Sequence, residues 1–249
     1  MTARDALYRD PRLVALYDTL NSARADEAFY RARLPAPPAR LLDVGCGTGR
    51  FARDCAAAGY TVTACDPAAQ MVEHAARGPG AGAVRWHVGT ADTLPIDAPF
   101  DAAVMMGHAF QCLLEDADIT ALFTAIVARL APGGSFWFET RNPAARPWQR
   151  WTPDHAAPPR LRPGGGTVQV VHEVLSRDGA LLTYAETYRL DGAPDLRSVS
   201  TLRFAEAAEI EALAASAGLS TAARFGTWTG APFDPGSSPE IIFHLKRAA

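Results

Sequence analysis

The chain has 249 residues, of which 48% are hydrophobic, enough for one α/β domain with an insertion or for two small domains. Its 24 basic and 27 acidic residues give a formal charge of −3, with no basic run, which argues against a nucleic-acid partner. The first residues lack the apolar core of a secretory signal, and no run has the length of a membrane-spanning helix. We therefore expect a cytoplasmic protein with no membrane partner.

Residue usage also excludes several chemistries. Lys246 is the only lysine, so a Schiff-base lysine or a phosphate-loop lysine is not expected. The histidines form no H-E-x-x-H pattern and the four cysteines form no C-x-x-C pair. Free thiols in a reducing compartment, and no metal site, are the prediction.

Helix and strand patterns alternate through the first half of the chain. Residues 1–34 have helical spacing and are followed by a proline-rich joint at 34–40. Strands are predicted at 40–45, 61–66, 84–89, 100–107 and 135–140. Helices are predicted at 50–59, at 67–76 with Pro67 in the first turn, and at 118–134. Such alternation predicts right-handed βαβ units and a parallel sheet.

The pattern then changes to strands with a period of two. Residues 166–175, 181–190 and 196–204 predict an antiparallel meander. A helix at 205–218 and strands at 220–230 and 240–247 follow. The whole chain thus predicts an α/β fold, with a doubly wound, mostly parallel seven-stranded sheet, a C-terminal antiparallel hairpin and an inserted β-meander.

A glycine-rich loop, "LLDVGCGTGR" at residues 41–50, follows the first predicted strand. Ligands of open parallel sheets bind beyond the carboxyl ends of the strands, where glycines allow the backbone to approach closely. The dinucleotide fingerprint places its third glycine three positions after the second, but Arg50 stands there and Gly49 comes one position early. This spacing argues against NAD or FAD, and a dinucleotide-binding or purely structural domain is the alternative. Asp66, at the end of the second strand, has the geometry of a ribose ligand.

Five stretches, "LLDVGCGTGR", "CD", "GTADTLP", "FDAAVMM" and "LAPGGSFWFE", occur in this order on the expected elements. They resemble the motifs of class I S-adenosylmethionine-dependent methyltransferases of the bacterial small-molecule type, over residues 38–140 and 220–247. The resemblance implies a Rossmann-like core, S-adenosyl-L-methionine as cofactor and S-adenosyl-L-homocysteine as product. It suggests a helical lid at 1–37, a core at 38–140 and 205–249, and an inserted substrate-side segment at 141–204.

The resemblance assigns the methionine part of the cofactor to the glycine loop. The residues that match this motif are Asp43, Gly45, Cys46, Gly47 and Gly49. Asp66 matches the acidic ribose ligand, with Pro67 beside it. Met71, one helical turn on, is expected to cover an adenine face, and its alternative role is core packing.

The third motif departs from the family at the adenine site. Thr90 stands where the family often has an aspartate, so either its hydroxyl or Asp92 would bind the adenine amino group. The backbone N–H of Ala91 is a further adenine contact. Met105 and Met106 end the fourth strand and are expected beside the sulfonium. Tyr17, in the expected lid, would contact the cofactor or be buried in a helix interface.

Methyl transfer is an in-line displacement, in which alignment dominates and a base is needed only if the nucleophile must lose a proton. His108 follows the fourth strand and is expected to contact the acceptor or act as general base, or else to be a positioned histidine without a proton role. Arg141 would clamp a carboxylate or phosphate, or form a structural pair with Glu139. Trp148 and Trp151 would line the pocket or anchor the insertion. The remaining candidates for the substrate pocket are Phe110, Gln111 and Asn142.

The predicted meander lies on the substrate face and would close the pocket over a small acceptor, or pair across a dimer. We expect a small-molecule acceptor methylated on oxygen or nitrogen, with a carboxylate or phenol slightly favoured over an amine. A monomer and a homodimer are both compatible with the sequence. Two alternatives are a methyltransferase of RNA or protein and a non-catalytic S-adenosylmethionine-binding module.

Overall fold

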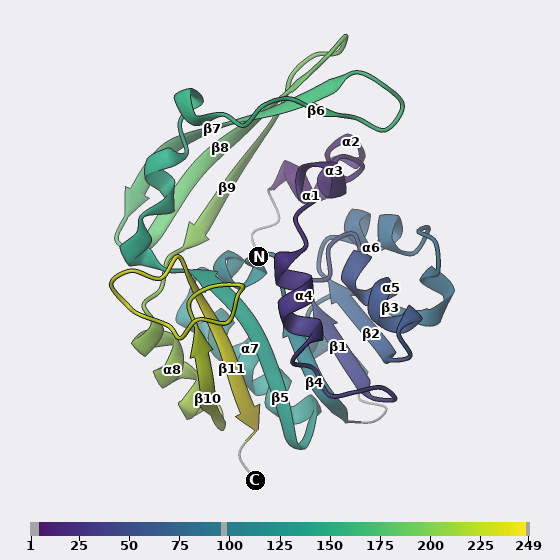
Figure 1. Ribbon diagram of the computed structural model, residues 1–249, viewed down its shortest axis with the longest axis vertical. Coiled ribbons are helices and arrows are strands. Elements are labelled where there is room, and N and C mark those ends of the chain that lie inside the picture. Colours follow the sequence, from purple (N-terminus) through teal and green to yellow (C-terminus); the bar gives the residue numbers. More distant parts are fainter. Residues whose placement is uncertain (1–4, 96–98, 248–249) are drawn as a thin grey trace.

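The computed structural model describes residues 5–95 and 99–247 and contains two sheets (Figure 1). The central sheet has seven strands in the order β10-β11-β5-β4-β1-β2-β3. The first five strands along the chain are parallel, while β11 runs antiparallel to both β5 and β10. The strands are β1 (Arg40–Val44), β2 (Thr61–Asp66), β3 (Val84–Val88), β4 (Phe100–Met105), β5 (Leu130–Arg141), β10 (Leu219–Phe225) and β11 (Glu240–Arg247). This arrangement confirms the predicted mostly parallel sheet with a late antiparallel hairpin.

Helices cover both faces of this sheet because neighbouring strand residues point to opposite sides. Leu42 belongs to the core cluster under α7 (Asp116–Arg129) and α8 (Ala207–Ser216). Leu41 belongs to the opposite cluster, which buries Phe51 of α5 (Arg50–Ala57). The sheet is therefore doubly wound, as predicted.

The helix after β2 begins later than expected. It is α6 (Ala69–Ala75), with Ala68 as its N-cap, so Pro67 lies before the helix and not in its first turn. The carboxylate of Asp66 accepts the N–H of Ala68 at 2.8 Å, and this bond holds the chain extended between strand and helix. Short 3₁₀ turns fill other connections, at η1 (Ala81–Ala83), η2 (Ala91–Thr93) and η3 (Ala109–Cys112).

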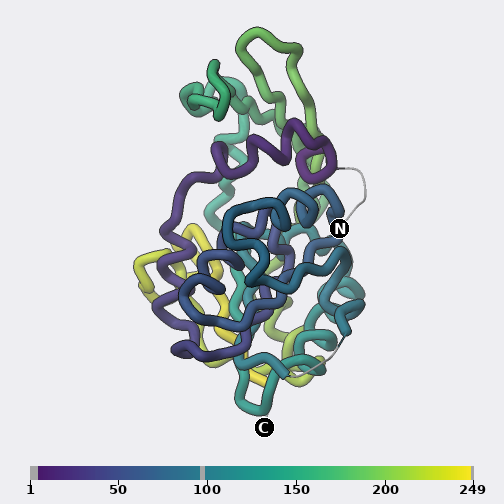
Figure 2. The backbone as a smooth tube through the Cα atoms, turned by 90° about the vertical axis from the view of Figure 1, so that its right-hand side faces the viewer, coloured from purple at the N-terminus to yellow at the C-terminus, as the bar shows by residue number. Residues whose placement is uncertain are grey.

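The amino-terminal segment forms four short helices, α1 (Ala6–Arg9), α2 (Pro11–Val14), α3 (Tyr17–Leu20) and α4 (Ala25–Arg31). Asp5 caps α1 and Asp10 caps α2 through backbone N–H groups. Figure 2 shows this segment passing from the core up to the second sheet. Val14 packs on Met71 of α6, while Leu13 packs with the second sheet, so the segment bridges the two parts of the molecule.

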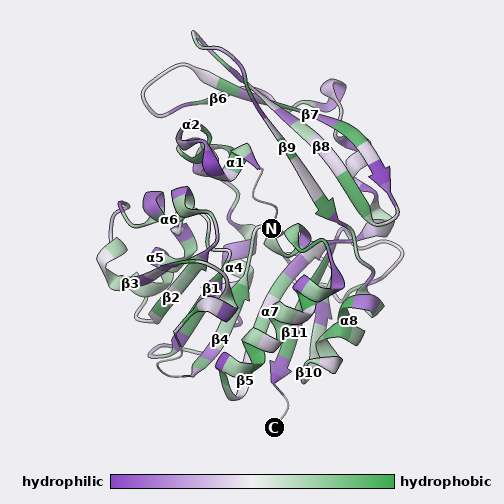
Figure 3. Cartoon of the chain, turned by 180° about the vertical axis from the view of Figure 1, so that it is seen from behind, coloured by the Kyte–Doolittle hydropathy of each residue, from purple (hydrophilic) through white to green (hydrophobic). Residues whose placement is uncertain are grey.

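The insertion is the predicted meander. It consists of β7 (Thr167–Asp178), β8 (Leu181–Leu190) and β9 (Leu196–Arg203), with β6 (Arg160–Leu161) at one edge. Polar and hydrophobic residues are interspersed along these strands (Figure 3). The 3₁₀ turns η4 (Pro143–Ala145), η5 (Pro147–Arg150) and η6 (Pro153–His155) connect the meander to β5. Within the described residues, no helix has the length and apolarity to cross a membrane.

Candidate active site

The glycine loop lies at the carboxyl end of β1, and its three glycines all have positive φ. A Cβ at Gly49 would lie 2.3 Å from the Trp86 ring, so close helix–strand packing requires glycine there. A Cβ at Gly47 would meet nothing within 4 Å, which leaves open space above the loop. The loop thus offers a bare backbone to a ligand.

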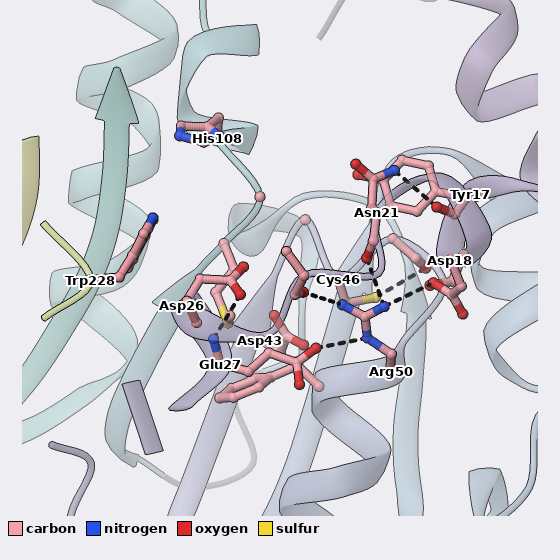
Figure 4. A pocket seen from close by; sticks show the side chains of 18 of the residues that line it. Tyr17, Asp18, Asn21, Asp26, Glu27, Asp43, Cys46, Arg50, His108 and Trp228 are labelled. Atoms are coloured by element: carbon pink, nitrogen blue, oxygen red, sulfur yellow. Dashed lines mark hydrogen bonds and ion pairs between the residues drawn. The ribbon is translucent and has the colours of Figure 1, made fainter. Parts of the chain in front are cut away.

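That space is a cavity of about 350 Å³ between the loop and the amino-terminal helices (Figure 4). Acidic side chains dominate its polar lining, and they are Asp18, Asp26, Glu27 and Asp43. Arg50 crosses the cavity to pair with Glu27 at 2.7 Å and to donate to the carbonyl of Asn21 at 2.9 Å. Arg50, which stands where the dinucleotide fingerprint has a glycine, therefore joins the amino-terminal helices to the glycine loop.

Asp43 forms the floor of this cavity. It is 2% exposed, and no described residue donates a hydrogen bond to its carboxylate. Burial, reinforced by the nearby charge of Asp66, raises the pKa of Asp43 to about 8. A buried acid without a protein partner is costly, so the site is suited to a cationic group of a ligand.

Asp66 lies at the end of β2, where its carboxylate accepts the N–H of Gly47 at 2.9 Å and that of Ala68. Burial raises its pKa, although these two backbone hydrogen bonds oppose the shift. A carboxylate has about four lone-pair sites, so a ribose contact needs no loss of either bond. The ribose role of Asp66 stays a prediction.

The residues expected around adenine do not line the described cavities. Met71 is fully buried beneath Val14, Tyr8 and Tyr17 of the lid. Thr90 donates a hydrogen bond to Asp92, and Ala91 is buried. Pro67, expected beside the ribose ligand, is exposed, and Met105, expected beside the sulfonium, is buried. The cofactor contacts of these residues remain predictions. Met71 packs in the core, as its alternative role proposed.

A second cavity, of about 260 Å³, lies beneath the meander. Five residues line both cavities, and they are Tyr17, Asn21, Gly107, His108 and Arg141. This junction is next to Met106, which lines the first cavity. Two adjacent cavities that share lining residues, one over the glycine loop and one under an enclosing sheet, suit a reaction between two bound molecules.

His108 occupies the junction in a left-handed conformation, with φ of 58°. Its backbone N–H donates to Glu139 at 2.7 Å, and its Nε2 lies 2.9 Å from Glu240 Oε2. Burial, and then the charge of Arg141, lower the pKa of His108 to about 3, while burial raises the pKa of Glu240 to about 7. The imidazole is therefore neutral near pH 7, and the same burial makes it a weaker base than a free imidazole.

Arg141 does not pair with Glu139, so the structural alternative for this arginine is wrong. Its Nη1 donates to Gln111 at 2.7 Å and its guanidinium lies 5.5 Å from the Trp151 ring. Glu139 instead accepts from the hydroxyl of Tyr30 and from the backbone of His108. Glu139 and Gln111 are buried and position the junction residues, and neither lines a described cavity.

Three expected substrate contacts lie elsewhere. Phe110 is buried in the core and stacks on Phe138 with ring centroids 4.5 Å apart, because the turn after His108 directs it inward. Asn142 donates to the carbonyls of Pro235 and Ser238 and so holds the β10–β11 connection. Trp148 packs edge-on against Phe204 and anchors the insertion. Of the two insertion tryptophans, Trp151 lines the second cavity.

The sequence predicted that the meander closes the pocket but identified none of the residues that form this wall. His172, Tyr184, Glu186 and Tyr188 line the second cavity from β7 and β8. Because every second residue of a strand points to the same face, the period of two in these strands could have indicated which side chains face the cavity. Trp228, from the β10–β11 connection, lines the first cavity and was also missed. Among the described residues, no group of His, Cys, Asp or Glu is arranged to hold a metal ion, and Cys46, Cys55, Cys65 and Cys112 are free thiols.

A glycine loop after the first strand, an acid ending the second, and a sheet closed by an antiparallel hairpin form the arrangement typical of class I S-adenosylmethionine-dependent methyltransferases, and this chain shares that arrangement. Residues 41–134 match the family model described as a methyltransferase domain.

Individual relatives agree with this assignment. The chain is 27% identical over 257 residues to a cypemycin N-terminal methyltransferase from Streptomyces sp, covering 96% of this chain and 97% of that protein. It is 35% identical over 132 residues to a ubiquinone biosynthesis O-methyltransferase from Xanthomonas campestris pv. campestris (strain B100), about half of either chain at 51% and 53%. The S-adenosylmethionine-bound structure of an amino pentose methyltransferase from Micromonospora echinaspora is similar at 26% identity and a TM-score of 0.66, over 92% of this chain and 91% of that one.

Proposed function

We propose that this enzyme transfers the methyl group of S-adenosylmethionine to an oxygen or nitrogen of a small molecule bound beneath the meander. The observation that carries this proposal is the junction, where five residues line both cavities. A cavity of about 260 Å³ suits a small acceptor and disfavours RNA or a folded protein. Its position next to the first cavity, with His108 lining both, disfavours a module that only binds the cofactor.

The first cavity suits the methionine part of the cofactor. Its ammonium group would pair with the unpartnered Asp43, which is expected to ionise when that cation binds. The glycine loop would lie against the same part, with Gly47 leaving room for close approach. S-adenosylmethionine, when bound, supplies an electrophilic methyl group on a sulfonium and leaves as S-adenosylhomocysteine.

His108 is placed to serve the acceptor. When Glu240 is protonated, it donates to Nε2, and the imidazole proton then resides on Nδ1. When Glu240 ionises, near pH 7, it accepts from Nε2–H and leaves the lone pair of Nδ1 free. Nδ1 has no hydrogen-bond partner among the described residues, and the ionised Glu240 on Nε2–H would offset the low basicity of the buried ring, so Nδ1 could accept the proton that the acceptor group loses.

The test is transfer of labelled methyl from S-adenosylmethionine to a panel of small amines, phenols and carboxylic acids. We expect label in at least one acceptor and one S-adenosylhomocysteine released per methyl group transferred. His108→Gln should lower turnover by about 10²-fold or more while S-adenosylhomocysteine binding is kept. Cofactor binding with no transfer to any small molecule, or transfer to RNA or protein alone, would contradict the proposal.

A further inference from the structure

The meander wall of the second cavity carries a buried carboxylate. Glu186 lies on β8, and its side chain is 12% exposed. It accepts from the hydroxyl of Tyr188 at 2.8 Å and lies 3.2 Å from Nε2 of His172. Within the described residues, no lysine or arginine is within ion-pairing distance of it. Its lone pairs are partly satisfied, but no permanent cation of the protein balances its charge.

The arginines on the same cavity are committed elsewhere. Arg141 donates to Gln111 and lies over Trp151, at the junction. Arg160 donates to the carbonyls of Thr19 and Leu20 and so holds α3 against β6. The guanidinium groups of Arg160 and Arg141 are therefore held at α3 and at the junction, and neither pairs with the carboxylate of Glu186.

A second carboxylate reinforces the negative charge at this wall. Asp5 accepts from the hydroxyls of Ser198 and Ser200 on β9. In the sheet register Ser198 is the partner of Glu186, and Ser200 is the partner of Tyr184. Asp5 is thus held beside the two residues at the centre of the wall. Burial and, more weakly, the charge of Glu186 raise the pKa of Asp5, while its hydrogen bonds to Ser198 and Ser200 oppose the shift.

Aromatic rings line the same cavity as the carboxylate. The rings of Trp151 and Tyr184 lie with centroids 4.8 Å apart, and His172 stacks with Tyr184 at 6.2 Å. The negative faces of such rings attract cations, most strongly where water is excluded. A carboxylate among aromatic rings is the chemistry that recognises an ammonium group.

We propose that this wall is a subsite for a protonated amino group of the acceptor, formed by Glu186 with Trp151, Tyr184 and Tyr188. The inference rests on the proposed function and narrows it. The acceptor carries an amino group held at Glu186 and, at the junction end near His108, a separate oxygen or nitrogen that receives the methyl group. This differs from the preference for a carboxylate or phenol that the sequence suggested, because the decisive residues lie in the meander.

The test uses the full chain saturated with S-adenosylhomocysteine and three probes that share one ring: benzylamine, benzyl alcohol and benzoate. Calorimetry should show benzylamine binding at least tenfold more tightly than the other two. Glu186→Gln should weaken benzylamine binding at least tenfold. Glu173→Gln is the matched control, because that carboxylate lies on β7 with a side chain 62% exposed and pairs with Arg197.

Several outcomes would overturn the inference. The inference is overturned if the unmodified protein binds benzoate or benzyl alcohol as tightly as benzylamine. Equal loss in Glu186→Gln and Glu173→Gln would overturn it as well. Failure of S-adenosylhomocysteine to bind would refute the proposed function itself, and this is read separately in the first titration.

Discussion

Replacing Asp66 tests whether one carboxylate both supports the glycine loop and binds the cofactor. Its side chain is 6% exposed and accepts two backbone N–H groups, from Gly47 at 2.9 Å and from Ala68 at 2.8 Å. Asp66→Ala leaves both donors without an acceptor, at about 1–3 kcal/mol each. We expect the free energy of unfolding to fall by about 2–6 kcal/mol, out of the roughly 5–15 kcal/mol of a typical domain.

Asp66→Asn separates the two roles. It keeps an oxygen for one N–H group, so the stability loss should be about 1 kcal/mol, while an amide cannot accept from both ribose hydroxyls as a carboxylate does. Urea unfolding followed by circular dichroism measures the first effect, and calorimetric titration with S-adenosylhomocysteine measures the second. An Asp66→Ala protein as stable as the original would refute the support role. Unchanged affinity in Asp66→Asn would refute the ribose role.

Three further predictions concern single carboxylates. Asp43→Asn should weaken S-adenosylmethionine binding at least tenfold and abolish the proton release that we expect on binding near pH 7, measured by calorimetry in two buffers. The raised pKa of Asp43 also means that its contribution to stability is lost as pH rises from about 4 to about 8, so this variant should flatten the stability–pH curve over that range. Long-range ¹H–¹⁵N spectra should show the imidazole proton of His108 on Nδ1 below pH 7 and on Nε2 above it, because Glu240 ionises there. Glu240→Gln should remove this change of tautomer. A change of tautomer that persists in the variant would contradict the pairing of His108 with Glu240. Asp5→Ala removes the N-cap of α1 and the hydrogen bonds from Ser198 and Ser200 of β9. Amide hydrogen exchange in α1 should therefore rise severalfold, while exchange in α7 stays unchanged. Equal exchange of α1 in the variant and the original protein would show that Asp5 does not hold the amino-terminal helices in place.

The sequence predicted the central sheet because its strands carry their own signals. β1 and β4 are short buried runs with proline before them and glycine after them, and the meander strands alternate with a period of two. These are local patterns, and the order of the five motifs placed them on one sheet. The glycine loop and Asp66 followed from their positions at the ends of strands.

The acceptor side was less predictable because its geometry depends on turns and distant pairs. His108 lines both cavities, but its positive φ turns the next residues inward and puts Phe110 against Phe138. Arg50 pairs with Glu27, 23 positions away, and no periodicity reveals that contact. Glu186 was overlooked because residues after β4 and β5 were expected to line the pocket.

Titration of the purified chain with S-adenosylmethionine, S-adenosylhomocysteine and NAD tests the central claim most directly. The cavity over the glycine loop, with Asp43 at its floor and Arg50 in place of a third fingerprint glycine, predicts saturable binding of the first two and none of NAD. Binding of NAD alone would contradict the cofactor assignment and the mechanism built on it.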